Sequence, residues 1–364
     1  MTKLRVGIVF GGKSVEHEVS LQSAKNILAA IDKTRFEPVL LGIDKQGKWH
    51  LNNSSNFLAN AKNPTLIALN YSGEILALVP GDTQNQVIAR YNGRPLAQLD
   101  VIFPVAHGTF GEDGSLQGLL RMTTLPFVGS GVLSSAVSMD KHFTKCLLRD
   151  AGLQLAPWIS VTKKKRSLIK AYEVIAHLGL PLFIKPANQG SSVGISKVDK
   201  LEAFEHALDL AFTFDHKVLI EKCITGREIE CAILGNDEPY ASPCGEVIVH
   251  DTFYNYETKY ISKTGAKIQV PAVIDSQTSD LIRTIAIKAF QKLECSGMAR
   301  VDFFLTEANK IFVNEINTLP GFTDISMYPK LWEAGGISCC NLITRLIELA
   351  LESHQQKMQL KSSI

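Results

Sequence analysis

Residues 297–317 are GMARVDFFLTEANKIFVNEIN, and their alternation predicts strands at 298–305 and 311–316 that turn at about Ala308-Asn309. Simple pairing puts Asp302 opposite Glu315 and Arg300 opposite Asn317, with all four side chains on one face. The other face is expected to be filled by Val301, Phe303, Leu305, Phe312 and Ile316.

Two carboxylates directly across a strand pair repel each other. A divalent cation removes this conflict, and Asp302, Glu315 and Asn317 supply the hard oxygen ligands that suit magnesium. The alternative is a solvent-facing polar surface with ordinary salt bridges.

Upstream, residues 183–198 are FIKPANQGSSVGISKV. A buried strand ends near Lys185, and the loop that follows is rich in Gly and Ser. Backbone N–H groups and hydroxyls of such a loop can bind phosphate oxygens, with the lysine as a point charge. The spacing is not that of a Walker loop, and on spacing alone a surface hairpin is equally consistent.

Residues 218–234, VLIEKCITGREIECAIL, contain two further strands. Glu221 ends the first strand and Glu228 opens the second. These carboxylates could bind an adenine amino group and ribose hydroxyls, respectively. Taken alone, the pattern fits a charged strand end in solvent equally well.

The first third alternates strands and helices, which predicts an open α/β sheet with ligands at the strand C-termini. Strands are expected at 4–10, 38–43 and 99–105, and Gly-rich loops at 11–18 and 107–114. We also predict a helix capped by Ser20, a hairpin at 71–73, and one helix over 133–150.

Bulk composition narrows the class of protein. The chain has 364 residues and a formal net charge of +2, so neither nucleic acid nor a membrane surface is expected as a partner. Seven scattered cysteines and no apolar run long enough for a membrane span predict a cytoplasmic protein.

Taken in order, these segments resemble an ATP-grasp enzyme, and in detail the D-alanine–D-alanine ligase family. The segments at 11–20 (GGKSVEHEVS), 107–120 (HGTFGEDGSLQGLL), 138–141 (SMDK) and 254–260 (YNYETKY) carry the specific resemblance, which covers nearly the whole chain. It implies an N-terminal open α/β domain of the biotin-carboxylase type at 1–130. A two-lobed ATP-grasp fold follows, with a central lobe at 131–228 and a C-terminal lobe at 229–364.

The resemblance implies that the enzyme joins two D-alanine molecules through a D-alanyl phosphate, for peptidoglycan precursors. It assigns two Mg²⁺ or Mn²⁺ ions to Asp302, Glu315 and Asn317. The residues that it assigns to ATP are Lys141, Lys185, Ser192, Glu221, Lys222, Ile224, Glu228 and Lys259, with Lys222 and Ile224 using backbone groups.

For the substrates, the resemblance places the first D-alanine ammonium at Glu16. It places the second carboxylate at Ser326 and the Met327 N–H, although many family members have leucine in place of Met327. The oxyanion is assigned to Arg300 and the Gly321 N–H, and His107 is expected near the acyl phosphate.

In the family, Glu16, Ser191 and Tyr260 form a hydrogen-bonded trio that holds a lid at 251–266. Closing such a lid would protect an acyl phosphate from water. Phenylalanine replaces this tyrosine in related ligases that make D-alanyl-D-lactate, so Tyr260 favours an amine nucleophile. The family also implies a homodimer and a bacterial source.

Other functions remain to be distinguished. A dinucleotide-dependent oxidoreductase is disfavoured, because the Gly-x-Gly-x-x-Gly spacing is absent after the first strand. A catalytically silent ATP-binding protein would be expected to lack Arg300 or a metal ligand. A carboxylase or another peptide ligase fits Glu16 and Tyr260 poorly, whereas a D-Ala–D-Ser ligase is harder to separate.

Overall fold

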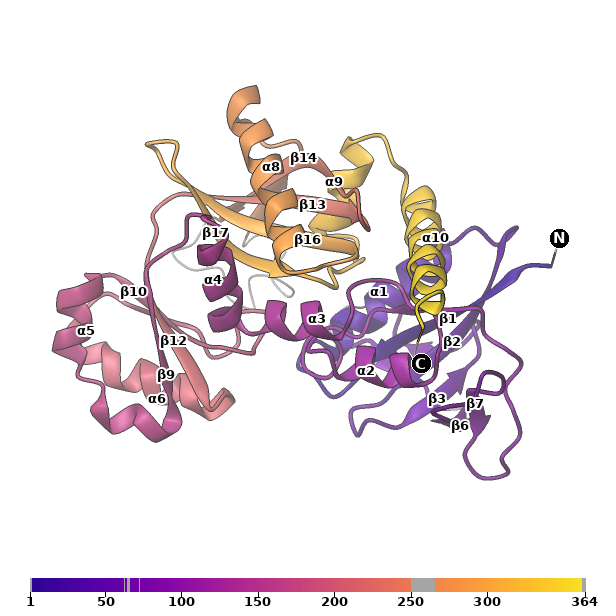
Figure 1. The fold of residues 1–364 in the computed structure, drawn as a ribbon. Helices are drawn as coiled ribbons and strands as arrows, with labels where there is room; N and C mark the ends of the chain where they lie inside the picture. Colours follow the sequence, from indigo (N-terminus) through magenta and orange to yellow (C-terminus); the bar gives the residue numbers. More distant parts are fainter. Residues whose placement is uncertain (1, 62, 64–65, 72, 250–265, 362–364) are drawn as a thin grey trace.

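The structure is a computed structural model that describes residues 2–61, 63, 66–71, 73–249 and 266–361 (Figure 1). Three larger sheets and a small pair of strands, β4 (Leu58–Ala59) and β5 (Ala68–Leu69), make up the β-structure of these residues. The α-helices of the described residues are α1 (His17–Ala30), α2 (Ser115–Met122), α3 (Val132–Met139), α4 (Lys141–Asp150), α5 (Ala171–Leu178), α6 (Phe204–Phe214), α8 (Ser276–Lys292), α9 (Met327–Ala334) and α10 (Cys339–Met358).

The first sheet has the order β7-β6-β3-β2-β1-β8. Its strands are β1 (Leu4–Gly11), β2 (Phe36–Ile43), β3 (Trp49–Asn52), β6 (Glu74–Leu78), β7 (Val87–Ala89) and β8 (Val101–Pro104). β1 pairs in parallel with β2 and β8, so the loops after β1 and β8 emerge at the same edge. This edge carries both predicted Gly-rich loops.

The second sheet has the order β11-β10-β12-β9. Its strands are β9 (Trp158–Thr162), β10 (Leu182–Pro186), β11 (Ser196–Val198) and β12 (Lys217–Lys222), and two 3₁₀-helices, η1 (Lys163–Leu168) and η2 (Leu201–Ala203), lie between them in the chain. α5 and α6 pack on this sheet around Phe204 and Ile184 and form a core of their own, at the far end of the molecule from the first sheet (Figure 1).

The third sheet has the order β15-β14-β13-β16-β17. Its strands are β13 (Arg227–Gly235), β14 (Tyr240–Val249), β15 (Ala266–Gln269), β16 (Gly297–Leu305) and β17 (Ile311–Asn317). One core packs α8 on this sheet around Phe290 and Phe303. A second core joins the third sheet, α9 and α10 to α1, β1 and β8 of the first sheet.

Most predicted strands and helices are confirmed, and three predictions about where a helix or hairpin begins, continues or turns are wrong. α1 begins at His17, and Ser20 lies inside it: its hydroxyl accepts from Gly11 N–H (2.7 Å) and donates to the Val105 carbonyl (2.5 Å). The helix predicted over 133–150 is two helices, because the Asp140 backbone is extended and its side chain caps α4. Of the hairpin predicted at 71–73, Ser72 lies outside the described residues, and the flanking strands pair elsewhere: β5 pairs with β4, and β6 pairs with β3 and β7.

Within the described part of the chain, no single helix is long and apolar enough to cross a membrane. α9 and α10, bent by 104° at their break, pass the same test as a pair, on length and composition alone.

Candidate active site

The polar face of the β16–β17 hairpin forms the centre of the site. The predicted register is confirmed: Asp302 pairs with Glu315, and Arg300 pairs with Asn317. All four side chains are half-buried, whereas Val301 and Ile316, which alternate with them, are buried. The face is therefore shielded from bulk water but open enough to receive a ligand.

The prediction that Phe312 faces the core is wrong. The register shifts after Asp302, because Phe303 pairs with Val313 and Asn314 is an extra residue in β17. As a result Ile311 and Val313 are buried, and Phe312 is half-buried opposite Phe304. The turn of the hairpin has three residues, and Asn309 in it has a φ of 54°. Next to the turn, Leu305 pairs with Ile311, which is one position away from the register predicted for a simple hairpin. The extra residue Asn314 makes up this difference, so that Asp302 still pairs with Glu315.

Arg300 binds two carboxylates. Its Nε and Nη2 donate to the two oxygens of Asp302 at 2.7 and 2.8 Å, and Nε lies 2.8 Å from Glu230 Oε2. Burial alone would lower the pKa of Arg300, but Asp302 and Glu230 hold it well above its usual range. Glu230 was not predicted from the sequence, because its position opposite Asp302 depends on the pairing of β13 with β16, which are 62 residues or more apart in the chain.

The hairpin supplies the donors for a metal ion but not a preformed metal centre. Asp302, Glu315 and Asn317 offer carboxylate and amide oxygens, which fit magnesium. In the structure Asp302 is engaged by Arg300, and Asn317 Oδ1 accepts from Leu319 N–H at 3.1 Å. Among the described residues no three His, Cys, Asp or Glu side chains converge on a metal position.

Glu16 joins the first sheet to the Gly/Ser loop that follows β10. The Ser191 hydroxyl donates a short hydrogen bond to Glu16 Oε1, as predicted for two members of the trio. Two glycines allow this approach: a methyl group at Gly108 would come 2.7 Å from Glu16 Oε2, and one at Gly190 would come 3.0 Å from it. Glu16 is only 8% exposed, so its carboxylate lies away from bulk water.

His107 lies between the first sheet and the loop that contains Gly321. Its Nδ1 is 3.1 Å from the Leu319 carbonyl, and its Nε2 is 3.0 Å from the Ser23 hydroxyl. A carbonyl only accepts, so Nδ1 carries the proton and Ser23 donates to Nε2. Ser23 Oγ also accepts from Phe322 N–H at 3.1 Å. His107 and Ser23 thus fix the backbone on both sides of Gly321, a role for Ser23 that the sequence analysis missed.

The predicted second-substrate residues lie at the start of α9. Ser326 Oγ accepts from Thr323 N–H at 2.9 Å, and a methyl group at Gly321 would come 2.7 Å from it. Met327 is buried and is the first residue of α9. The Ser326 hydroxyl, the Gly321 backbone and the His107 contacts therefore belong to one small region.

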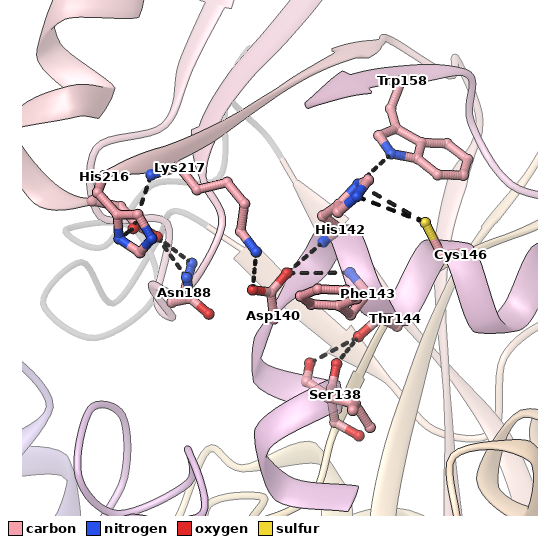
Figure 2. Close-up of polar contacts among 12 residues, drawn as sticks. Ser138, Asp140, His142, Phe143, Thr144, Cys146, Trp158, Asn188, His216 and Lys217 are labelled. Atoms are coloured by element: carbon pink, nitrogen blue, oxygen red, sulfur yellow. Dashed lines mark hydrogen bonds and ion pairs between the residues drawn. The ribbon is translucent and has the colours of Figure 1, made fainter. Parts of the chain in front are cut away.

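Lys141 connects the Gly/Ser loop to the hairpin. Its Nζ donates to the Gln189 carbonyl at 2.7 Å and lies 3.8 Å from Glu315 Oε2. Lys141 is the first residue of α4, directly after the cap residue Asp140, whose other oxygen is paired with Lys217 of β12. Figure 2 shows this pair, together with Trp158, which donates to His142 Nδ1 at 3.2 Å. The α4 N-terminus is thereby tied to the second sheet.

Glu221 is buried in the second sheet, with one lysine at each carboxylate oxygen: Lys185 of β10 and Lys145 of α4. Glu221 and Lys185 were predicted as site residues from the sequence, whereas Lys145 was not. Lys145 follows Lys141 by one helical turn, which was the available signal.

The remaining predicted ATP residues surround this cluster less closely. Lys222 is exposed, and its N–H donates to the Pro157 carbonyl at 2.9 Å. Ile224, Ser192 and Glu228 are half-buried. Glu228 shares its face of β13 with Glu230, because the two are two residues apart along the strand. Lys259, Tyr260 and the rest of the lid predicted at 251–266 lie outside the described residues, except Ala266, which begins β15.

The chain is similar to known ligases over its full length. The family model described as D-ala D-ala ligase N-terminus matches residues 5–130, and that described as D-ala D-ala ligase C-terminus matches residues 147–348. D-alanine–D-alanine ligase A of Escherichia coli K12 is 62% identical over 364 residues, which cover 100% of both chains. D-alanine–D-alanine ligase of Shouchella clausii is 58% identical over 364 residues, 100% of this chain and 99% of that one.

Solved structures show the same similarity. The D-alanine–D-alanine ligase of Coxiella burnetii has a TM-score of 0.86 and 38% identity, over 99% of this chain and 97% of that one. The VanG D-Ala:D-Ser ligase of Enterococcus faecalis has a TM-score of 0.84 and 34% identity, over 96% of this chain and 100% of that one. The predicted ATP-grasp fold class is confirmed by these neighbours.

Proposed function

Because the chain belongs to the D-alanine–D-alanine ligase family, we infer that the site described above joins two D-alanine molecules into D-alanyl-D-alanine with consumption of ATP, a step of peptidoglycan synthesis. The chain is an ATP-dependent ligase. The assignment of the reaction to this site rests on the β16–β17 face, where Arg300, two carboxylates and Asn317 lie next to Lys141.

For ATP, we propose that Lys141, Lys185 and Lys259 contact the phosphates, with Ser192 and the Gly/Ser backbone around them. Glu221, Lys222, Ile224 and Glu228 hold the adenosine, Lys222 and Ile224 through the backbone. The contact of Lys141 with the Gln189 carbonyl supports this assignment, because it puts a cation between the Gly/Ser loop and the hairpin.

Two Mg²⁺ or Mn²⁺ ions are proposed at Asp302, Glu315 and Asn317, whose oxygens fit hard cations. When bound, such ions neutralise charge on the transferring phosphoryl group. The chain contributes Arg300, which pairs with Asp302 and orients this carboxylate.

In the proposed first step, Glu16 binds the ammonium of the first D-alanine. The carboxylate of this D-alanine attacks the γ-phosphorus, so an acyl–oxygen–phosphorus bond forms and ADP leaves. Glu16 suits this role because it is buried and adjoins Ser191. Tyr260 completes the trio and holds the lid over the acyl phosphate.

In the proposed second step, Ser326 and the Met327 N–H bind the carboxylate of the second D-alanine. Its amine, after losing a proton, attacks the acyl carbon, and phosphate leaves as the peptide bond forms. Arg300 and the Gly321 N–H stabilise the oxyanion. His107 orients the backbone around Gly321 through the Leu319 carbonyl and Ser23.

We further propose that the chain divides into domains at residues 130 and 228, works in the cytoplasm, and forms a homodimer. The N-terminal family model, which ends at residue 130, agrees with the first boundary. Light scattering coupled to size-exclusion chromatography tests the dimer, with an 80 kDa particle expected from a 40.0 kDa chain (2 × 40.0).

The function is tested by incubating the purified protein with ATP, magnesium and D-alanine. Release of phosphate should match formation of D-alanyl-D-alanine by mass spectrometry. D-serine, D-lactate and L-alanine are offered separately as the second substrate, because one structural relative is a D-Ala:D-Ser ligase. Preferential formation of a mixed dipeptide or depsipeptide would contradict the assignment of D-alanine as the nucleophile.

A further inference from the structure

Lys145 is a buried charge that the proposed mechanism does not use. Its side chain is 1% exposed, and its Nζ is paired with Glu221 Oε1. The same Nζ lies 5.6 Å from the centre of the Trp158 ring, and Trp158 is the strand neighbour of Glu221 in the pairing of β9 with β12. Both the ring and the carboxylate thus hold the ammonium in place.

Glu221 faces two lysines rather than one. Its Oε2 is paired with Lys185, whose side chain is 9% exposed, and Glu221 itself is 4% exposed. One carboxylate and two ammonium groups give these three side chains a formal charge of +1. An excess charge away from water is costly unless an anion joins it. A nucleotide phosphate is such an anion, and Lys185 lies at the start of the Gly/Ser loop.

We propose that Lys145 is a positioning residue for ATP. It remains the counter-ion of Glu221, and Lys185 can therefore exchange between Glu221 and the nucleotide phosphates. This inference rests on the proposed function, in which Lys185 binds phosphate and Glu221 binds adenosine. Lys141, one helical turn earlier on α4, belongs to the phosphate site, so one helix face supplies both a phosphate contact and the counter-ion.

Without Lys145, Lys185 becomes the cation that balances Glu221. Moving Lys185 to a phosphate would then leave a buried carboxylate without a counter-ion, which is a strongly unfavourable state. Binding of ATP would weaken, whereas the D-alanine sites, which lie on the first and third sheets, would be unchanged.

The test replaces Lys145 by methionine, which keeps much of the side-chain volume and removes the charge. We expect the KM for ATP to rise by about tenfold or more. The KM for D-alanine and the kcat at saturating ATP should stay within about twofold of the parent enzyme. Arg149→Met is the matched control, because Arg149 contacts the same Trp158 ring (5.3 Å) but is exposed on α4.

A double-mutant cycle with Glu221→Gln separates this role from a purely structural one. If Lys145 acts through Glu221, the K145M substitution should change the KM for ATP much less in the E221Q enzyme than in the parent. If K145M does not fold, Lys145→Gln takes its place in the cycle.

An unchanged KM for ATP in K145M, an equal loss in R149M, or additive effects in the cycle would overturn the inference while ligation by the parent enzyme persists. Absence of ligation by the parent enzyme would instead refute the proposed function.

Discussion

At the residue scale, Arg300 lies between the carboxylates of Asp302 and Glu230 on a half-buried face of the third sheet. The two carboxylates orient the guanidinium and keep it charged. A group held in this way can stabilise an oxyanion without reorganising during the reaction, which is the condition for a large catalytic effect.

We therefore predict that Arg300→Lys lowers kcat by roughly a hundred- to a thousandfold, with a small change in the KM for ATP. Lysine keeps the charge but loses the two-nitrogen contact with Asp302. Steady-state kinetics measure this effect, and Arg283→Lys on α8 is the control, expected to keep the parent kcat. A kcat close to that of the parent in R300K would remove Arg300 from the proposed chemistry.

His142 gives a prediction about pH. Burial and the nearby Lys217 lower its pKa below the usual 6.5, and Trp158 N–H donates to its Nδ1. Just below pH 6.5, His142 therefore takes up a proton in the unfolded chain but stays neutral in the folded protein. The contribution of His142 to the free energy of unfolding is present above pH 6.5, and it falls as the pH drops toward the lowered pKa of the folded protein.

Urea unfolding at pH 7.5 and 5.5 measures this effect. His142→Gln keeps an acceptor for Trp158 but does not titrate, so the free energy of unfolding should fall less between these two pH values than in the parent. Phe214→Leu, an exposed aromatic residue on α6, should keep the parent difference. The same fall in H142Q as in the parent would contradict the prediction.

At the element scale, sequence patterns predicted the hairpin of β16 and β17 and the pairing of its polar residues. They did not predict the bulge at Asn314, because the three-residue turn that requires it leaves little trace in the alternation of side chains. They also missed the break between α3 and α4, since the apolar period continues across it. That break is stabilised by Asp140, whose side chain caps α4 and also pairs with Lys217 of the distant strand β12.

The cap of α4 is expected to matter for both stability and nucleotide binding. Asp140→Ala should lower the free energy of unfolding by about 1–2 kcal/mol and raise the KM for ATP, because Lys141 is the next residue. Urea unfolding and kinetics measure these two effects. Asp140→Asn, which keeps the cap acceptor at His142 N–H, should lose less stability.

The matched comparison is Ser338→Ala, which removes the cap of α10 far from the Gly/Ser loop. Ser338→Ala should lower the free energy of unfolding and leave the KM for ATP unchanged. If S338A raised the KM for ATP as much as D140A does, the effect of Asp140 would be general destabilisation rather than placement of Lys141.

At the scale of the whole molecule, the site is assembled from three sheets. Glu16 comes from the first, Ser191 and Lys185 from the second, and Arg300 from the third. Local patterns identified candidate segments, and the family resemblance related Glu16 to Ser191. The contacts of Arg300 with Glu230, of Lys145 with Glu221 and of Ser23 with His107 depend on long-range packing, for which single-sequence periodicity has no signal.

In the proposed mechanism, the terminal phosphoryl group of ATP is transferred to the carboxylate of the first D-alanine before the peptide bond forms. The most direct measurement uses D-alanine with ¹⁸O in both carboxylate oxygens and follows the label into the released phosphate by mass spectrometry. We expect one ¹⁸O atom in each phosphate formed together with D-alanyl-D-alanine, because the bridging oxygen leaves with phosphorus. Phosphate without ¹⁸O, accompanied by normal amounts of dipeptide, would contradict it.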